Sequence, residues 1–333
     1  MTSRPLEASD HAAVMALPDA VRARLGAADA DAWRERLAVA SGTTAHRLGR
    51  WRGDALIGIG ELIPSARGRT RHVGTVRVAA IEAGDARALW GALRTLADDE
   101  LGLLRLDAEL AEDDAVLPVL AADGFAIEAV HPGYVARADA RLAAVALGRL
   151  RPGFVPSVGL APPPPPPRAA AAPVILRRAI PDDAPAVAAL MRDPHVTWGT
   201  LQLSSTSADA WRPRLASATS WTAEVGGEVV GNAGLQRLPA PSAHVGGIGM
   251  AVAGAWQGRG IGGALLDQLI RGAEALGLEA LVLDVYDDNA RALALYQRAG
   301  FARLGTRRAE TWRLGGYANS IVMQRPIGPA SGR

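Results

Sequence analysis

The chain of 333 residues contains neither cysteine nor lysine. Without cysteine it cannot form disulfide bonds, use a thiolate nucleophile or carry an acyl group as a thioester. Without lysine it cannot form a Schiff base through a side-chain amine. Composition alone therefore excludes two common routes of covalent catalysis.

An excess of charge of one sign is also missing. The 36 basic side chains, all of them arginine, are balanced by 34 acidic ones, which gives a formal net charge of +2. Because the acidic residues are spread among the arginines, we expect no nucleic-acid partner. The six histidines form no pair at metal-ligand spacing, so we expect no metal.

Long hydrophobic runs are absent, although 49% of the residues are hydrophobic. No stretch of 18 uncharged apolar residues occurs, so we expect no membrane partner. The first residues lack the basic and then apolar pattern of a secretory signal, which makes a cytoplasmic protein the expectation. The length and the apolar content suffice for two domains, each with its own core.

Residues Pro162 to Pro167 are six consecutive prolines. Such a run adopts an extended polyproline helix and does not join a helix or a sheet, so it predicts a semi-rigid spacer. We expect residues 151–173 to link one domain at 1–150 to a second domain at 174–327. A docking site for a proline-recognising module is the alternative, which nothing else in the sequence supports.

The two halves share short matching segments that occur in the same order. Because one such match is chance but four in register imply the same elements, the sequence predicts a duplicated domain. The offsets lie between 172 and 178 residues, and the pairs are Ala30–Leu37 with Ala208–Leu215, His72–Gly74 with His244–Gly246, Leu101–Asp107 with Leu276–Asp284, and Gly124–Ala126 with Gly300–Ala302.

The second copy alternates between patterns typical of strands and of helices. Gly226 and Gly227 are typical of a tight hairpin turn. The order predicts an α+β (mixed α/β) fold with two similar domains, each a twisted, mostly antiparallel mixed sheet flanked by helices. Strands are expected at 174–178, 220–225, 228–237, 245–252, 280–286 and 320–325, and helices at 182–191, 208–215, 260–276 and 289–299.

The segment from Met250 to Gly263 runs from a strand through a glycine-rich loop into a helix. Amide groups at a helix N-terminus are unpaired and carry partial positive charge, which suits a pyrophosphate. Glycines let the backbone approach phosphate oxygens, and Arg259 adds a permanent cation. The loop predicts a phosphate cradle over Gln257–Gly263, and a glycine turn without a ligand is the alternative.

A dinucleotide site is a rival interpretation of the same loop. Gly258, Gly260 and Gly263 fit G-x-G-x-x-G, and Asp284 follows 21 residues later. Five residues, however, separate Val252 from Gly258, whereas a dinucleotide-binding turn follows its strand at once. About 50 residues remain after Asp284, too few to complete a doubly wound sheet, so we disfavour a dinucleotide.

The arrangement resembles the GCN5-related N-acetyltransferase (GNAT) superfamily over most of residues 174–326. The family's cofactor motif, Gln/Arg-x-x-Gly-x-Gly/Ala, is matched by Gln257, Gly260 and Gly262, and a second motif by Asn289, Ala292, Tyr296, Gly300 and Phe301. The resemblance implies that acetyl-CoA lies on the cradle, along a splayed strand that ends near Val252, and beside Asn289. The implied cofactor-binding residues are Met250, Val252, Gln257, Gly258, Arg259, Gly260, Ile261, Gly262, Gly263 and Asn289.

Tyr296 is the residue that the resemblance marks for catalysis. In the family this tyrosine lies near the thioester sulfur and protonates the leaving thiolate, a role that suits a phenol with a pKa of about 10. A core aromatic on a helix face is the alternative. Glu224, on an expected central strand, is the candidate base, with Asp284 and His244 as alternatives. Residues 246–249, Gly-Gly-Ile-Gly, stand where several relatives carry an acidic residue.

The acceptor site is expected between the first two helices of the second copy. Trp198, Thr200 and Gln202 lie there, and with Trp211 and Arg313–Tyr317 they resemble a GNAT subgroup that acetylates free amino acids and similar small amines. Core packing is the alternative for both tryptophans and is favoured for Trp211. We expect acetyl transfer to the primary amine of a small molecule by direct attack on the thioester, which needs no cysteine.

The first copy lacks the chemical groups of the second. Residues 79–86 replace the cradle and contain one glycine, while Glu82 and Asp85 would repel a pyrophosphate. Leu120 stands where Tyr296 would be, and Asp113 stands in the place of the asparagine. We therefore expect a degenerate, non-catalytic GNAT-like domain and one acetyl-CoA per chain, in a monomer that acts as a pseudo-dimer or in a homodimer.

Two other functions fit the same sequence. A mycothiol-synthase-like acetyltransferase is also a tandem GNAT protein with a degenerate N-terminal half. A non-catalytic acyl-CoA-binding or regulatory protein would keep the cradle without turnover. Cofactor binding and acceptor-dependent release of free thiol distinguish the three.

Overall fold

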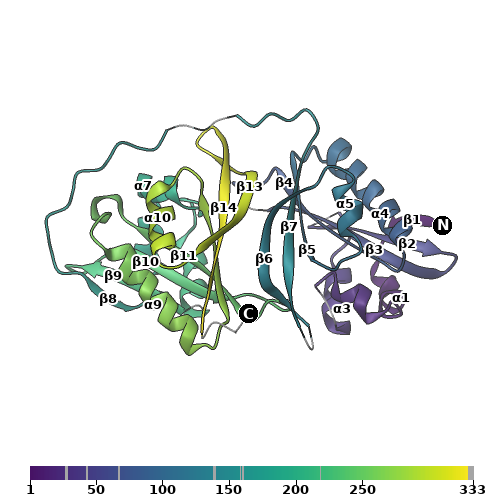
Figure 1. The fold of residues 1–333 in the computed structure, drawn as a ribbon, viewed down its shortest axis with the longest axis horizontal. Coiled ribbons are helices and arrows are strands. Elements are labelled where there is room, and N and C mark those ends of the chain that lie inside the picture. The colour runs from purple at the N-terminus through teal and green to yellow at the C-terminus, as the bar shows by residue number, and fades with distance from the viewer. Residues whose placement is uncertain are drawn as a thin grey trace. The chain divides into compact units, whose positions relative to one another are not determined.

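The computed structural model describes residues 1–26, 29–42, 44–66, 68–137, 140–157, 159, 161–217 and 219–328. The chain divides into two compact units, Met1–Val155 and Pro156–Arg333 (Figure 1). No helix in the described ranges is long and apolar enough to cross a membrane.

The N-terminal unit is built on a mixed sheet with the strand order β1-β2-β3-β4-β5-β7-β6. Neighbouring strands run antiparallel except β4 and β5, which are parallel. The strands are β1 (Thr2–Pro5), β2 (His46–Arg52), β3 (Ala55–Pro64), β4 (Val73–Ala80), β5 (Arg105–Ala111), β6 (Ala126–Ala136) and β7 (Arg141–Leu150).

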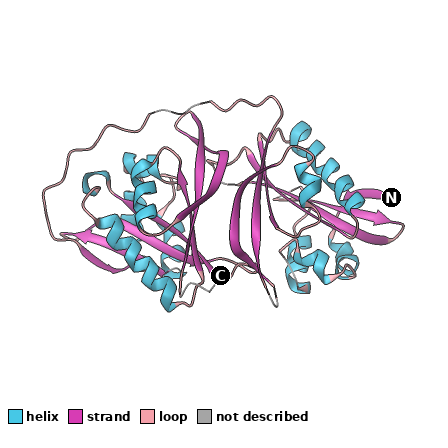
Figure 2. Ribbon diagram, viewed as in Figure 1, coloured by secondary structure: helices cyan, strands magenta, loops and turns pink. Residues whose placement is uncertain are grey.

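Helices cover both faces of this sheet (Figure 2). Successive side chains of a strand point to opposite faces. Along β3, Gly58 lies under Leu89 of α4, whereas Ile59 belongs to the core formed with α1–α3. The helices are α1 (His11–Met15), α2 (Asp19–Ala23), α3 (Ala30–Ala38), α4 (Ala83–Thr95) and α5 (Leu117–Ala121), with a π-helical segment at Leu96–Glu100.

The C-terminal unit repeats this topology strand for strand. Its sheet has the order β8-β9-β10-β11-β12-β14-β13, and β11 and β12 form the parallel pair. The strands are β8 (Ile175–Arg178), β9 (Thr219–Val225), β10 (Glu228–Arg237), β11 (Val245–Val252), β12 (Ala280–Tyr286), β13 (Ala302–Arg313) and β14 (Gly316–Pro326).

Helix α9 provides the main packing on one face of this second sheet, against β9, β10 and β11. Its residues Ile261, Leu265, Leu269 and Ala273 recur every four positions and are all buried, so they form one apolar stripe. The helices are α6 (Ala184–Leu190), α7 (Pro194–Gly199), α8 (Ala208–Ser217), α9 (Ile261–Ala275) and α10 (Ala290–Arg298).

The predicted fold class is confirmed: both units are mixed, mostly antiparallel sheets flanked by helices. Strands β10, β11 and β12 begin and end where the sequence predicts. Among the α-helices and strands described in the C-terminal unit, the short helix α7 and the strand β13 were not predicted. The sequence of strand β13 includes the charged residues Arg307, Arg308 and Glu310, so its apolar residues do not alternate regularly. The register of its pairing with β14 also shifts between Arg307 and Thr311.

One of the four matched pairs needs a correction. The parallel register places Val73 opposite Arg105 in the first unit and Val245 opposite Ala280 in the second. Counting along the strands from these pairs, Asp107 corresponds to Val282, and Asp284 has a different counterpart. The sequence match across Leu276–Asp284 is therefore right at its start and wrong at its end.

Candidate active site

Strands β11 and β12 are paired over three residues and then diverge. Val245–Gly247 face Ala280–Val282, while β11 continues to Val252 and β12 to Tyr286. On its other side β11 stays paired with β10 as far as Val252. Residues 248–252 of β11, which include Met250, therefore have one backbone edge without a partner among the described strands. Such an edge is suited to hydrogen bonding with an extended ligand.

The loop after β11 turns through two left-handed glycines. Gly258 has a φ of 74° and Gly260 a φ of 82°. A Cβ added at either would meet nothing within 4 Å, so the backbone conformation is what requires glycine here. Gly260 is the N-cap of α9 and brings no capping side chain. The first amides of α9, at Ile261, Gly262 and Gly263, therefore have no intrahelical partner.

Gln257 links this loop to the end of the strand. Its Nε2 donates to the carbonyl of Val252 at 2.8 Å. Its Oε1 is buried without a hydrogen-bond partner in the described structure. A buried acceptor without a partner, beside unpaired helix amides, is consistent with a site that a polar ligand completes. The residues present thus fit a pyrophosphate-bearing cofactor.

The proline-rich segment lies against the same loop and belongs to the C-terminal unit. The amide of Ala169 donates to the carbonyl of Ala255 at 3.2 Å, and Arg259 donates to the carbonyl of Ala169. His195 Nε2 donates to the carbonyl of Pro164 at 2.8 Å. A spacer needs no such contacts, so this segment also forms part of the wall around the site.

Asn289 and Tyr296, the two residues of the second family motif that were assigned a function, lie at the start of helix α10 and within it. Asn289 is its N-cap: Oδ1 accepts from the amide of Ala292 at 3.2 Å, and Nδ2 lies 3.5 Å from the carbonyl oxygen of Gly199. Tyr296 is 7% exposed and packs edge-on against Phe301, with 5.7 Å between the ring centres. Burial raises the pKa of Tyr296 to about 12, so its hydroxyl is protonated at neutral pH.

Trp198 meets a buried arginine that the sequence did not single out for this contact. The guanidinium of Arg313 lies 4.7 Å from the ring centre of Trp198 and 4.2 Å from that of Tyr286. Arg313 also donates to the carbonyl of Trp198 at 3.0 Å and to Asp288 Oδ1 at 3.1 Å. The contacts tie α7, the end of β12 and the start of α10 to one side chain.

Helix α7 is anchored at its other end by Asp193. Oδ1 of Asp193 accepts from the amide of His195 at 2.8 Å and from that of Val196 at 3.3 Å, which caps the helix. Oδ2 accepts from the amide of Gly254 at 3.0 Å, in the turn that follows β11. A single carboxylate therefore positions α7 beside the glycine loop.

Two predicted site residues, Glu224 and Gln202, lie outside this cluster, and a third, Thr200, lies at its edge. Glu224, on β9, accepts from Arg177 Nε at 2.8 Å and is separated from β11 by β10. Gln202 is exposed and accepts from Arg214 Nη1 at 3.3 Å. Thr200 directly follows α7 and is half-buried.

The alternative bases and the second tryptophan also have defined positions. Asp284 lies on β12 with Oδ1 3.7 Å from Arg307 Nε. His244 precedes β11, at the end of the strand opposite the glycine loop. Trp211 is 8% exposed and packs in the core with Leu215, as favoured from its counterpart in the first copy.

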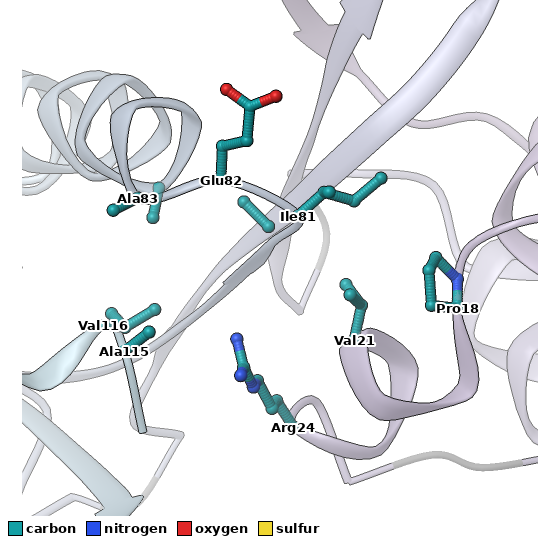
Figure 3. A pocket seen from close by; sticks show the side chains of 10 residues that line it. Pro18, Val21, Arg24, Ile81, Glu82, Ala83, Ala115 and Val116 are labelled. Atoms are coloured by element: carbon teal, nitrogen blue, oxygen red, sulfur yellow. The ribbon is translucent and has the colours of Figure 1, made fainter. Parts of the chain in front are cut away.

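The N-terminal unit holds different groups at the equivalent turn. Only Ile81 and Glu82 connect β4 to α4, and Glu82 is the N-cap with an extended φ of −118°. A cavity of about 260 Å³ lies here; the Arg24 side chain points toward it, and the Glu82 carboxylate points away (Figure 3). Asp85 is buried and lies 3.4 Å from Arg50. No glycine turn is present at this helix start.

Backbone hydrogen bonds identify the counterparts of the motif residues. The amide of Phe125 donates to the carbonyl of Leu120, as that of Phe301 does to Tyr296, so leucine replaces the tyrosine as predicted. The amide of Asp114 donates to the carbonyl of Ala111 and closes the turn after β5, just as the amide of Asn289 donates to that of Tyr286 and closes the turn after β12. The counterpart of Asn289 is therefore Asp114, and the expectation of Asp113 was wrong. Asp114 lies 3.6 Å from Arg24.

Within the described ranges no group of three or more histidine, aspartate or glutamate side chains is placed to hold a metal ion.

Comparison with known proteins assigns the family. The model of the acetyltransferase (GNAT) family matches residues 185–301. The L-amino acid N-acetyltransferase AaaT of Escherichia coli is 31% identical over 156 residues, which are 45% of this chain and 96% of that protein. The N-alpha-acetyltransferase RimI of Mycobacterium tuberculosis is 42% identical over 112 residues, 33% of this chain and 66% of that protein.

Among solved structures, a GNAT-superfamily phosphinothricin acetyltransferase from Sinorhizobium meliloti in complex with AcCoA aligns with 48% of this chain and 92% of its own. The sequence identity is 21% and the TM-score is 0.45. The 31% identity over nearly the whole length of the amino-acid acetyltransferase is the match that shows the family. On this evidence the chain belongs to the GNAT family of acetyltransferases.

Proposed function

We propose that residues 174–327 form an acetyl-CoA-dependent N-acetyltransferase that acetylates the primary amine of a small molecule, an amino acid above all. The observation that carries this proposal is the separation of β11 from β12 after Gly247. The open edge of β11 leads directly into the left-handed glycines and unpaired amides at the start of α9. The open edge of β11 is complementary to an extended ligand arm, and the amides at the start of α9 are complementary to a pyrophosphate that follows it.

Each group has a role in this proposal. The amides of Ile261, Gly262 and Gly263 and the cation of Arg259 hold the pyrophosphate. The edge of β11 and Asn289 hold the pantetheine arm. Acetyl-CoA supplies an acetyl group activated as a thioester.

Tyr296 acts as the general acid. The amine attacks the thioester carbonyl carbon, so that a C–N bond forms, the C–S bond breaks and the nitrogen gives its proton to the general base. Tyr296 donates its proton to the departing thiolate. A pKa of about 12 keeps the tyrosine protonated at neutral pH, and it also makes the phenol a weaker proton donor than an exposed tyrosine.

The base remains a prediction. Glu224 accepts a 2.8 Å hydrogen bond from Arg177, and strand β10 separates its strand β9 from the open edge of β11. We therefore expect Glu224→Gln to slow turnover less than Tyr296→Phe does.

The lengths of the matches favour a free amino acid as acceptor. This chain spans 96% of the L-amino acid N-acetyltransferase but 66% of the M. tuberculosis N-alpha-acetyltransferase and 49% of a ribosomal-protein-alanine N-acetyltransferase. The 42% identity to the second of these nevertheless makes a protein N-terminus the second candidate acceptor.

We propose further that residues 1–150 are a degenerate GNAT-like domain that binds no acetyl-CoA. Support comes from Glu82 and the buried Asp85 at the equivalent turn, and from Leu120 in place of the tyrosine. Residues 151–173 form the linker. One acetyl-CoA per chain is the expected stoichiometry.

Calorimetric titration of the full chain with acetyl-CoA, followed by a thiol-release assay, tests this proposal. The chain has no cysteine, so with an acceptor that carries no thiol a thiol reagent detects only free CoA. Acetylation of an acceptor with its own thiol is followed by the mass of the product. The acceptor panel contains amino acids, an alanine-terminated peptide and the amine precursor of mycothiol. One bound acetyl-CoA and turnover with amino acids are expected. Binding without turnover on any amine would contradict catalysis and support an acyl-CoA sensor, and two bound cofactors would contradict the degenerate domain.

A further inference from the structure

A cavity of about 480 Å³ opens in the C-terminal unit beside α7. Its wall combines the proline-rich segment, α7, the residues after α7 and the β13–β14 turn, which contributes Leu314. Cavities of about 300–1,000 Å³ are typical of small-molecule sites. The volume therefore suits a ligand of the size of an amino acid.

The proline-rich segment is held in place where it lines this cavity. Ala161 and Pro163 contribute to the wall, and the next residue, Pro164, accepts a hydrogen bond from His195 at 2.8 Å. A Cβ added at Gly254 would lie 3.1 Å from the ring of Pro166, so the segment is closely packed there as well. The segment is thus a fixed wall of the cavity.

The polar groups of the cavity are one cation and several hydroxyls. Arg192, Ser204 and Ser205 supply the donors, whereas the Thr197 hydroxyl already donates to the carbonyl of Met191 at 2.9 Å. No acidic residue is among the described residues that line the cavity. Hydroxyl groups and a guanidinium are donors that together favour an anion.

Arg192 has no competing partner in the described structure. The exposed side chain of Arg192 takes part in none of the hydrogen bonds or ion pairs of the described residues, unlike that of Arg177, which binds Asp183 and Glu224. Only its backbone amide is engaged, by the carbonyl of Ala189 at 3.0 Å. The adjacent carboxylate, Asp193, is engaged by the amides of α7 and of Gly254. The guanidinium at the cavity wall is therefore available for a ligand.

The cavity adjoins the cluster that contains Asn289. Thr197 and Leu314, which line it, are the chain neighbours of Trp198 and Arg313. Those two residues contact each other, and Arg313 also binds Asp288, which directly precedes Asn289. The wall of the cavity and the cluster around Asn289 are therefore built from adjacent residues of α7 and of the β13–β14 turn.

We infer that Arg192 binds the carboxylate of the acceptor in this cavity and thereby selects amines that carry a free carboxylate. The inference rests on the proposed function and narrows it to amino acids. Arginine presents paired N–H donors that match the two oxygens of a carboxylate, and the hydroxyls of Ser204 and Ser205 add further donors. The same cation repels polyamines and other acceptors of purely positive charge.

The test compares an amino acid with its own carboxamide on the full chain. The two acceptors share the side chain, and the difference in basicity between their amines is the same for every variant. The change in their kcat/KM ratio between wild type and Arg192→Gln therefore isolates the contact with the carboxylate. We expect the wild type to prefer the amino acid by about 10- to 100-fold. Arg192→Gln should raise the KM for the amino acid by a similar factor, with kcat nearly unchanged and the kinetics of the carboxamide unaffected. Arg192→Lys should retain part of the preference.

Arg271→Gln is the matched control, because Arg271 is exposed on α9 and does not line the cavity. Its kinetics with both acceptors should equal those of the wild type. A titration with acetyl-CoA should give the same Kd for wild type, Arg192→Gln and Arg271→Gln.

Three outcomes overturn the inference while leaving acetyl transfer intact. The wild type could use both acceptors equally, Arg192→Gln could lose kcat/KM for both acceptors by the same factor, or Arg192→Gln could have the same kcat/KM as the wild type for the amino acid. Failure to acetylate any amine despite acetyl-CoA binding would instead contradict the proposed function. The two failures are therefore distinguishable.

Discussion

Arg313 and Trp198 are joined by a hydrogen bond and by a stacking contact, although they lie 115 residues apart in the chain. Arg313 Nη1 donates to the carbonyl of Trp198 at 3.0 Å, and its guanidinium lies 4.7 Å from the ring centre. Helix α7, which Trp198 helps to end, has six residues. Because so short a helix is not stable by itself, such contacts determine where it lies.

Replacing this arginine should loosen α7. Arg313→Met keeps much of the apolar stem but loses the hydrogen bonds to Trp198 and Asp288 and the contact with two aromatic rings. We expect the free energy of unfolding to fall by about 1–3 kcal/mol. Urea denaturation measures this, with Arg271→Met as an exposed control that should change stability by less than about 0.5 kcal/mol. Equal stability of the two variants would contradict the anchoring role.

The left-handed turn before α9 should not tolerate a side chain. In Gly260→Ala the new residue must adopt a φ of 82°, which costs about 1–2 kcal/mol, or the helix start must shift. Either result displaces the amides proposed to bind the pyrophosphate, so we expect the Kd for acetyl-CoA to rise at least about tenfold. Gly91→Ala on α4 is the control: its Cβ also meets nothing within 4 Å, and its φ is not positive. Unchanged cofactor binding in Gly260→Ala would remove the cradle from the proposal.

Tyr296→Phe separates chemistry from packing. The ring still fills its place against Phe301, but no proton is available for the thiolate. We expect kcat to fall by about 10²- to 10⁴-fold with little change in the Kd for acetyl-CoA. Steady-state kinetics and titration together measure both quantities. Wild-type turnover in this variant would leave Tyr296 as a core residue only.

The pKa of Tyr296 also predicts how stability changes in alkaline solution. It is raised by burial from 10.0 to about 12, so the folded state holds its proton more tightly than the unfolded state does. The contribution of this group is complete below pH 10 and is lost as the pH rises from 10 to about 12, by about 2–3 kcal/mol. Tyr296→Phe should lack this decline. Urea unfolding of both proteins across this range gives the comparison, and parallel curves would show that the shift is absent.

Asp183 should have the opposite dependence on pH. Hydrogen bonds from Arg177 hold its pKa below the ordinary 3.8, and the amide of Ile180 adds to this effect. Its contribution is therefore complete above about pH 4 and is lost as the pH falls through the lowered pKa. Asp183→Asn should lower the free energy of unfolding at pH 7 by about 1–3 kcal/mol and flatten its decline in acid. Asp182→Asn is the matched control, because Asp182 is 86% exposed and should contribute less than about 0.5 kcal/mol.

Several features of the site were predictable because the signals for them are local. The glycine pair at 226–227 marks the β9–β10 turn, and the two glycines 258 and 260 mark the turn before α9 through their positive φ. The apolar residues of α9, spaced by four, predict which side of the helix is buried. Each of these features depends on the backbone preferences of a few adjacent residues.

Residue roles were less predictable where a role depends on a distant partner. Glu224 is predicted as a base from its position on a strand, but its hydrogen bond from Arg177, 47 residues away, is visible only in the structure. Asp113 was expected opposite Asn289, but the turn after β5 closes at Asp114. In both cases the pattern of neighbouring residues contains no information about the partner.

By itself, the sequence determined the fold class, the duplication and the presence of a glycine-rich helix start, because turn chemistry and hydrophobic periodicity act over short distances along the chain. Only the tertiary structure decided that β11 leaves β12 after three pairs, that Arg313 binds Trp198, and that the proline-rich segment lines a cavity with Arg192. These contacts join residues far apart in sequence. Their formation depends on which elements pack together, and the free energy of that packing is a property of the whole fold.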